Sequence, residues 1–308
     1  MSGVLAPVVT PFDGGLRPDA RRFAGHCRWL LDQGCGLAVF GTNSEANSLA
    51  LRERMELLDS LVAGGIDPVR MMPGVGTCAI PETVALTRHA LDHGVGGVLM
   101  LPPFYYKGVS DEGLYRSYAE VIERTADERL RIYLYHFPQM SAVPLGVDLI
   151  GRLLRDFPGI VVGMKDSSGD AANLERVLEA FPGFALFAGT ESLLLANLRL
   201  GGAGCISATA NINPAAIVDL YQGWRSAPAD ELQAQLDAIR QTMQQYPLLP
   251  ALKTVIAHYA DDPEWDRVRP PLVELTAEQG ASLIAELDAL GFAMPGVGCG
   301  GGAGPSVR

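Results

Sequence analysis

Lys165 is the residue of this 308-residue chain whose type and position point most directly to chemistry. It is one of only three lysines, and it closes the apolar run Ile160–Lys165, so its stem is expected to begin inside a sheet. A buried ammonium without a partner is costly, and such a lysine tends to lose its proton or to pair with a carboxylate. The neutral amine attacks carbonyl carbons, and the position therefore predicts Schiff-base chemistry. A structural pair with Asp166 or another carboxylate is the alternative.

Two other segments carry groups that would assist this lysine. Tyr135 lies near the end of the apolar run Arg131–His136, from which a phenol could move protons while an imine forms. A core tyrosine whose hydroxyl is satisfied by the backbone is the alternative. The segment Gly41–Glu45 predicts a turn whose N–H groups and short hydroxyls could hold a carboxylate, although such turns also serve as helix caps.

The elements that must position these groups are short apolar runs alternating with helical segments. Near-continuous apolar character is typical of parallel strands buried on both faces. The eight expected strands are Val4–Val9, Gly36–Gly41, Arg70–Val75, Gly97–Leu101, Arg131–His136, Ile160–Lys165, Phe184–Gly189 and Ala203–Ala208. The expected helices between them are Pro18–Gln33, Leu51–Ala63, Pro81–His93, Asp111–Ala126, Val147–Phe157, Ala172–Phe181 and Glu191–Leu200.

This alternation predicts an α/β fold, a (β/α)8 TIM barrel over residues 1–226 that carries the active site. A doubly wound open sheet is the rival, but the G-x-G-x-x-G turn is missing after the first expected strand. Later helical patterns predict the eighth barrel helix and a small C-terminal helical appendage over 227–294. The glycine-rich segment 295–308 is expected to be a flexible tail. These later patterns are Pro214–Ser226, Ala229–Tyr246, Leu249–Tyr259 and Ala277–Leu290.

A barrel would also gather the polar segments, because enzymes of this fold place their chemistry at the carboxyl ends of the strands. The expected strands end in such segments, and Gly163 is expected to leave space beneath the Lys165 amine on the same strand face. The polar segments at the strand ends are Gly41–Glu45, Tyr135–His136, Lys165–Gly169, Gly189–Thr190 and Ser207–Thr209.

Composition excludes several other classes of function. A net charge of −11 argues against nucleic acid or an anionic membrane as a partner, and no apolar run approaches the roughly 20 residues of a membrane span. The five scattered cysteines fit a reducing cytoplasm. His89 and His93 have a metal-like i, i+4 spacing, but the sequence shows no third ligand beside them, so no metal is expected.

At this point the motifs resemble those of the dihydrodipicolinate synthase and N-acetylneuraminate lyase family of pyruvate-dependent class I aldolases. The resemblance runs from Ala6–Phe12 to Arg269–Leu272. Gly41–Glu45 is similar to the family's G-T-T-G-E loop, Tyr135–Pro138 to its Y-N-x-P stretch, and Lys165–Asp170 to its K-D-S-S-G-D segment. The strand-eight signature resembles Gly202–Ser207.

The resemblance implies a role for each site residue. Lys165 would form the imine with pyruvate, Tyr135 would relay protons, and Thr42 and Asn43 would hold the carboxylate. Tyr105, or Tyr106 because of one extra residue here, would enter a neighbouring active site in a homo-oligomer, a dimer of dimers. No cofactor or metal is expected beside the covalent imine, and the substrate would be a small 2-oxo acid. Gly189, Ile206 and Ser207 would line the pocket.

Departures from the family pattern bear on the substrate. Family members that condense pyruvate with aspartate semialdehyde carry an arginine where this chain has Met140, and a thioether cannot replace a bidentate carboxylate fork. The sequence therefore favours an aldolase or dehydratase acting on a 2-oxo-3-deoxy sugar acid or a 4-hydroxy-2-oxo acid. The alternatives are 4-hydroxy-tetrahydrodipicolinate synthase and a catalytically inactive oxo-acid-binding relative.

Overall fold

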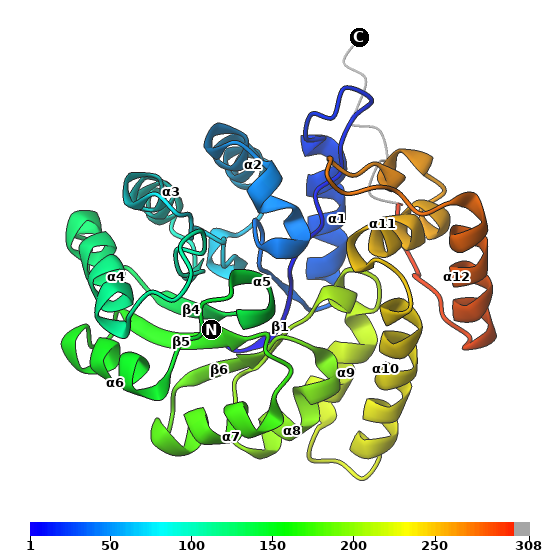
Figure 1. Cartoon of the computed structure of the whole chain (residues 1–308). Helices are drawn as coiled ribbons and strands as arrows, with labels where there is room; N and C mark the ends of the chain where they lie inside the picture. The colour runs from blue at the N-terminus through cyan, green and yellow to red at the C-terminus, as the bar shows by residue number, and fades with distance from the viewer. Residues whose placement is uncertain (299–308) are drawn as a thin grey trace.

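The computed structural model describes residues 1–298 and shows a parallel sheet inside a ring of helices (Figure 1). Seven strands pair in the order β2-β1-β7-β6-β5-β4-β3, and every pairing is parallel. The strands are β1 (Gly3–Ala6), β2 (Gly36–Leu37), β3 (Val98–Met100), β4 (Ile132–His136), β5 (Val161–Asp166), β6 (Ala185–Ala188) and β7 (Gly204–Ile206). This is the α/β, TIM-barrel-like architecture that the alternating pattern predicts.

The third expected strand, Arg70–Val75, is wrong as a regular strand. Its first residue ends a 3-10 helix, Pro68–Arg70, and Pro73 has no N–H with which to continue a ladder. The segment nevertheless joins the two outer strands of the sheet, because Met72 N donates to Leu37 O at 2.7 Å and Val75 N donates to Leu99 O at 2.9 Å. Residues 71–75 thus lie between β2 and β3.

Twelve α-helices occur in the described residues, and the pattern locates eleven of them to within a few residues. The exception is the short α5, which follows Phe137 at Pro138, a residue suited to a first helical position. The helices are α1 (Ala20–Asp32), α2 (Leu51–Ala63), α3 (Ile80–Asp92), α4 (Asp111–Thr125), α5 (Pro138–Ser141), α6 (Val147–Asp156), α7 (Ala171–Ala180), α8 (Leu194–Arg199), α9 (Pro214–Gly223), α10 (Ala229–Gln244), α11 (Leu248–Tyr259) and α12 (Ala277–Ala289). None of them is long and apolar enough to span a membrane.

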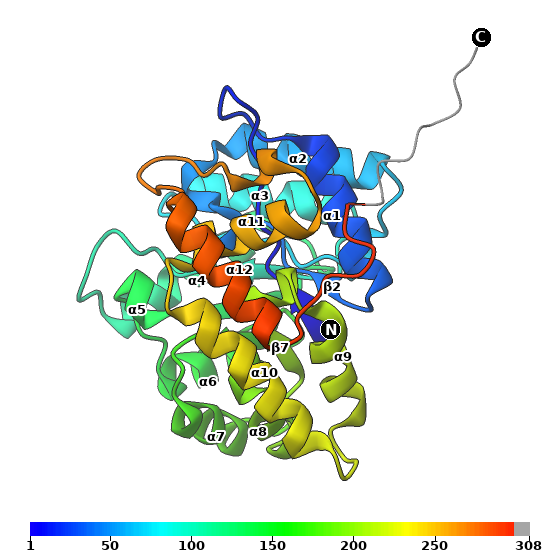
Figure 2. The ribbon, with the colours of Figure 1, turned by 90° about the vertical axis from the view of Figure 1, so that its right-hand side faces the viewer.

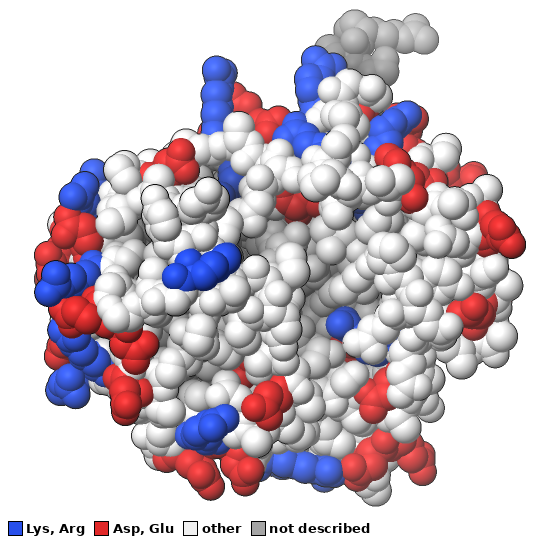
Figure 3. All heavy atoms as spheres, in the orientation of Figure 1, with Lys and Arg blue, Asp and Glu red and all other residues white. Residues whose placement is uncertain are grey.

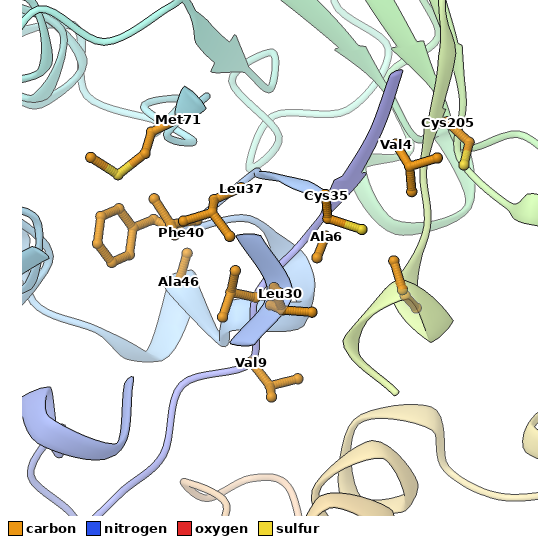
Figure 4. Close-up of a cluster of buried hydrophobic side chains, with 14 of the residues drawn as sticks. Val4, Ala6, Val9, Leu30, Cys35, Leu37, Phe40, Ala46, Met71 and Cys205 are labelled. Atoms are coloured by element: carbon orange, nitrogen blue, oxygen red, sulfur yellow. The ribbon is translucent and has the colours of Figure 1, made fainter. Parts of the chain in front are cut away.

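Two apolar clusters lie on opposite sides of the strands. The larger one fills the layer between strands and helices; in Figure 4, Leu30 of α1 lies beside Leu37 and Ala6. The smaller one fills the interior of the sheet, and the side chain of each member is buried. Its members are Leu5, Ala38, Met72, Leu99, Tyr133, Tyr135, Phe187 and Ile206. The interior is therefore a packed core, so reactive groups are expected at the carboxyl ends of the strands and not in the middle of the sheet.

The C-terminal helices lie together on one side of the molecule (Figure 2). α10 packs against α9, and α12 packs against both α10 and α11. The predicted tail begins within the described residues: 295–298 form a turn in which Val297 is buried, and Trp29 Nε1 donates to Pro295 O at 3.0 Å. The rest of that prediction, 299–308, lies outside the described residues.

Candidate active site

Lys165 and Tyr135 are brought together by the register of two neighbouring strands. They are direct partners in the β4–β5 ladder, and their side chains are 5% and 4% exposed. Lys165 Nζ donates to the Tyr135 hydroxyl at 3.3 Å and lies 4.5 Å from the centre of the ring. The amine and the phenol that the sequence predicts to cooperate are therefore in hydrogen-bond contact.

Thr42 extends this pair into a chain of three polar groups. Its Oγ1 lies 3.2 Å from the Tyr135 hydroxyl, and either oxygen can be the donor. A proton can thus pass between the lysine amine and the threonine hydroxyl through one phenol. Asn43 follows in the same 3-10 turn and is half-buried.

The alternative role for Lys165, an ion pair with Asp166, does not occur. The carboxylate of Asp166 accepts from Ser168 N at 2.8 Å and from Asn173 Nδ2 at 2.7 Å. Within residues 1–298, Lys165 forms no ion pair with any carboxylate. Burial lowers the pKa of the neighbouring His136, although the charge of Asp166 acts in the opposite direction. Nδ1 of His136 accepts a hydrogen bond from Leu145 N at 3.1 Å. The Lys165 amine is therefore buried, and the Tyr135 hydroxyl is the group to which it donates.

The expectation that Gly163 leaves space beneath the amine is wrong. A Cβ at Gly163 would lie 2.5 Å from Tyr133 Cδ1 and 2.4 Å from Ala185 O. The absent side chain makes room for the Tyr133 ring, which packs edge to face on Phe187. Aromatic side chains therefore fill the space below Lys165.

A buried ion pair fixes the Thr42 loop from behind. Glu45 ends this turn in the left-handed region with φ 53°, and its carboxylate accepts from Lys253 Nζ and, at 2.9 Å, from Arg269 N. Burial lowers the pKa of the Lys253 ammonium, while Glu45 acts in the opposite direction. Lys253 also donates to Arg267 O at 2.7 Å. Helix α11 and the segment 267–269 thereby hold the loop that carries Thr42.

The other predicted pocket residues divide between the interior and the outer layer. Ile206 belongs to the interior cluster with Tyr135. Ser207 points elsewhere, because its hydroxyl donates to the buried carboxylate of Glu191, as does that of Thr209. Glu191 was not predicted as the partner of these hydroxyls, although an acid directly after Gly189–Thr190 at a strand end is a signal for a buried polar contact.

Gly189 is required by close packing next to the lysine strand. A Cβ there would lie 2.3 Å from Ser167 Oγ and 2.7 Å from Asp166 O. Gly189 N also donates to Asp166 O at 2.7 Å. The glycine therefore sets how closely β6 approaches the end of β5.

Tyr105 and Tyr106 are not brought to Lys165 within the single chain. Their side chains are 72% and 73% exposed, and the two rings pack edge to face on each other at 5.3 Å. Val109 and Met140 are exposed as well. The aromatic loop is thus free to contact another molecule.

An uncharged cavity adjoins Thr42 and Tyr135. Thr42 and Tyr135 contribute polar groups to it, and its other walls are mostly apolar or glycine. In Figure 3 the charged side chains lie mainly around the periphery of this face, while its central hollow is surrounded by mostly uncharged atoms. The cavity is lined by Phe40, Gly41, Thr42, Ala46, Asn47, Gly74, Gly76, Leu99, Leu101 and Tyr135.

Comparison with known proteins agrees with this geometry. The dihydrodipicolinate synthetase family matches residues 1–290. The chain is 36% identical to 4-hydroxy-tetrahydrodipicolinate synthase of Thermus thermophilus over 287 residues, which cover 90% of this chain and 92% of the relative.

Two crystal structures resemble the whole fold. Dihydrodipicolinate synthase from Agrobacterium tumefaciens superimposes with a TM-score of 0.88 at 33% identity, covering 94% of this chain and 99% of that one. YagE, a prophage protein of the same family from Escherichia coli, was crystallised in complex with pyruvate. It gives a TM-score of 0.86 at 27% identity, covering 95% and 99% of the two chains.

Proposed function

The chain belongs to the dihydrodipicolinate synthetase family and is a lyase of that family, and from this premise we propose that Lys165 forms a Schiff base with the keto carbon of pyruvate or a pyruvate-derived 2-oxo acid. The observation that carries the proposal is the hydrogen-bonded chain of the buried Lys165 and Tyr135 with the partly buried Thr42, joined at 3.3 and 3.2 Å. The pyruvate in the related YagE structure supports the choice of ligand.

The proposed steps follow from the positions of these groups. The amine adds to the keto carbon, and water leaves as the carbinolamine collapses to the imine. Tyr135 supplies the proton for the departing hydroxyl and later moves the proton that is lost when the enamine forms. Thr42 orients the phenol, and Asn43 with the loop N–H groups binds the substrate carboxylate. Gly189 and Ile206 shape the pocket wall. Ser207 contributes to this wall indirectly, through its hydrogen bond to Glu191.

For the second half of the substrate, we propose a 2-oxo-3-deoxy sugar acid or a 4-hydroxy-2-oxo acid, split by aldol cleavage or dehydrated. Met140 supports this choice, because it is 62% exposed on α5 and supplies no charge to grip a second carboxylate. The identity to the Thermus thermophilus enzyme favours the second candidate, 4-hydroxy-tetrahydrodipicolinate synthase.

The barrel is proposed to comprise eight strands over residues 1–226. The segment 71–75, third in chain order, would complete the seven regular strands, and the helical region 227–294 would support the barrel. The exposed Tyr105 and Tyr106 support a homo-oligomer in which one of them reaches a neighbouring site. Cys27, Cys35, Cys78 and Cys205 are free, which supports a cytoplasmic setting.

Borohydride trapping with pyruvate, followed by peptide mass spectrometry, tests the mechanism. A reduced adduct is expected on Lys165 in the wild type and in Lys107→Met, whose lost lysine lies on the surface, and none in Lys165→Met. If neither pyruvate nor longer 2-oxo acids yield an adduct, the Schiff-base proposal is refuted and the oxo-acid-binding relative is favoured. Turnover of 2-oxo-3-deoxy acids compared with condensation of pyruvate and aspartate semialdehyde then distinguishes the two substrate candidates.

A further inference from the structure

Three side chains with metal-binding atoms converge on the outer helical layer, apart from the buried lysine. Asp59 belongs to α2, His89 lies in the last turn of α3, and His93 caps that helix. His89 Nε2 lies 2.8 Å and His93 Nε2 2.7 Å from the same oxygen, Asp59 Oδ1. The three ligand atoms all lie within 4.8 Å of one another.

The backbone explains why these groups meet. Residues four apart lie on the same face of a helix, so both imidazoles of α3 point to the same side. α2 packs beside α3 and supplies Asp59 from thirty residues earlier in the chain. The sequence shows the two histidines but not their third partner, and the expectation that no third ligand accompanies them is therefore wrong.

The donor set suits a particular class of ion. Two imidazole nitrogens and one carboxylate oxygen are ligands of Zn²⁺ and similar divalent transition metals, which accept three protein ligands and one open position. Without a metal, one carboxylate oxygen must accept from two N–H groups at once. A cation that replaces the two N–H protons would bond to both imidazole nitrogens and to the carboxylate oxygen.

The surroundings also favour a cation. The carbonyl end of α3 carries partial negative charge, and His93 sits at that end. The side chains of His89 and His93 are 21% and 25% exposed and that of Asp59 is 53% exposed, so an ion and a fourth ligand can reach the cluster from solvent. The largely covered rings lose less rotamer freedom on binding than fully exposed ones would.

We propose that Asp59, His89 and His93 form a binding site for one Zn²⁺ or a chemically similar divalent ion, which joins α2 to α3. These helices follow the Thr42 loop and the segment 71–75, so the ion would stabilise two parts of the barrel that border the uncharged cavity. The site is separate from the Schiff-base chemistry, and either proposal can fail without the other.

The experiment uses the full chain, freed of metal by a chelator and titrated calorimetrically with Zn²⁺. One ion per chain is expected, with a rise in the melting temperature. His93→Asn and Asp59→Asn should each weaken binding by more than the roughly 10- to 100-fold that loss of an outer-shell partner costs, and should abolish the thermal shift.

Two variants serve as controls for binding elsewhere on the surface. His258→Asn removes an exposed histidine outside the cluster, and Cys78→Ser removes the exposed thiol. Both are expected to bind Zn²⁺ like the wild type, and circular dichroism of each metal-free variant confirms that it is folded. The proposal is overturned if the wild type shows no saturable binding, or if a folded His93→Asn chain binds as tightly as the wild type.

Discussion

Removing the hydroxyl of Tyr135 distinguishes the proposed catalytic role of this residue from its contribution to stability. Tyr135→Phe keeps the ring that packs in the barrel interior and deletes only the oxygen that links Lys165 to Thr42. The neighbouring Tyr133→Phe is the matched control, because it removes another buried hydroxyl from the same face of the same strand.

The expected magnitudes differ strongly between activity and stability. A positioned acid–base group contributes about 10²- to 10⁴-fold to a rate, so the barrier should rise by about 3–5 kcal/mol. A typical hydrogen bond contributes only about 0.5–1.5 kcal/mol, so the loss of two should lower the free energy of unfolding by at most about 3 kcal/mol. Tyr135→Phe should therefore fold but turn over slowly.

The assay needs only pyruvate. In D₂O, enamine formation exchanges the methyl protons of pyruvate for deuterium, and NMR follows the loss of the methyl signal. Tyr133→Phe should exchange at a rate close to that of the wild type. If Tyr135→Phe also exchanges within about tenfold of the wild-type rate, Tyr135 is not the proton relay and the mechanism drawn from the distances is wrong.

Three further predictions concern stability, each measured by urea denaturation. Gly189→Ala should cost about 1–3 kcal/mol because its Cβ meets backbone, whereas Gly25→Ala, with open space in α1, should stabilise by up to about 1 kcal/mol. Lys253→Met should cost about 3–5 kcal/mol by leaving Glu45 buried and unpaired, and adding Glu45→Gln should recover part of the loss. Burial lowers the pKa of His26 from 6.5 to about 4, so only the unfolded chain binds that proton as the pH falls below 6.5. The free energy of unfolding should drop by about 2 kcal/mol more between pH 7 and pH 5 in the wild type than in His26→Phe.

Local patterns were sufficient for most of the elements and for the reactive groups. Lys165 and Tyr135 each stand next to the last residue of a strand that is an apolar run in the sequence, so both side chains could be placed near strand ends before any contact was known. Helix limits such as those of α2 followed from periodicity and stop signals. The segment 70–75 was wrongly predicted as a regular strand, because its composition is that of a strand while Pro73 and a preceding 3-10 turn interrupt the ladder.

The amino-acid pattern predicts which residue types stand at the ends of the strands, because burial on both faces leaves a direct trace in composition. Which of these residues meet depends on tertiary packing. Ladder register placed Tyr135 beside Lys165, and packing of α2 on α3 placed Asp59 between two histidines. Glu45 pairs with Lys253 across more than two hundred residues of chain. Such contacts depend on how whole elements pack, and no local sequence pattern encodes a contact between residues so far apart in the chain.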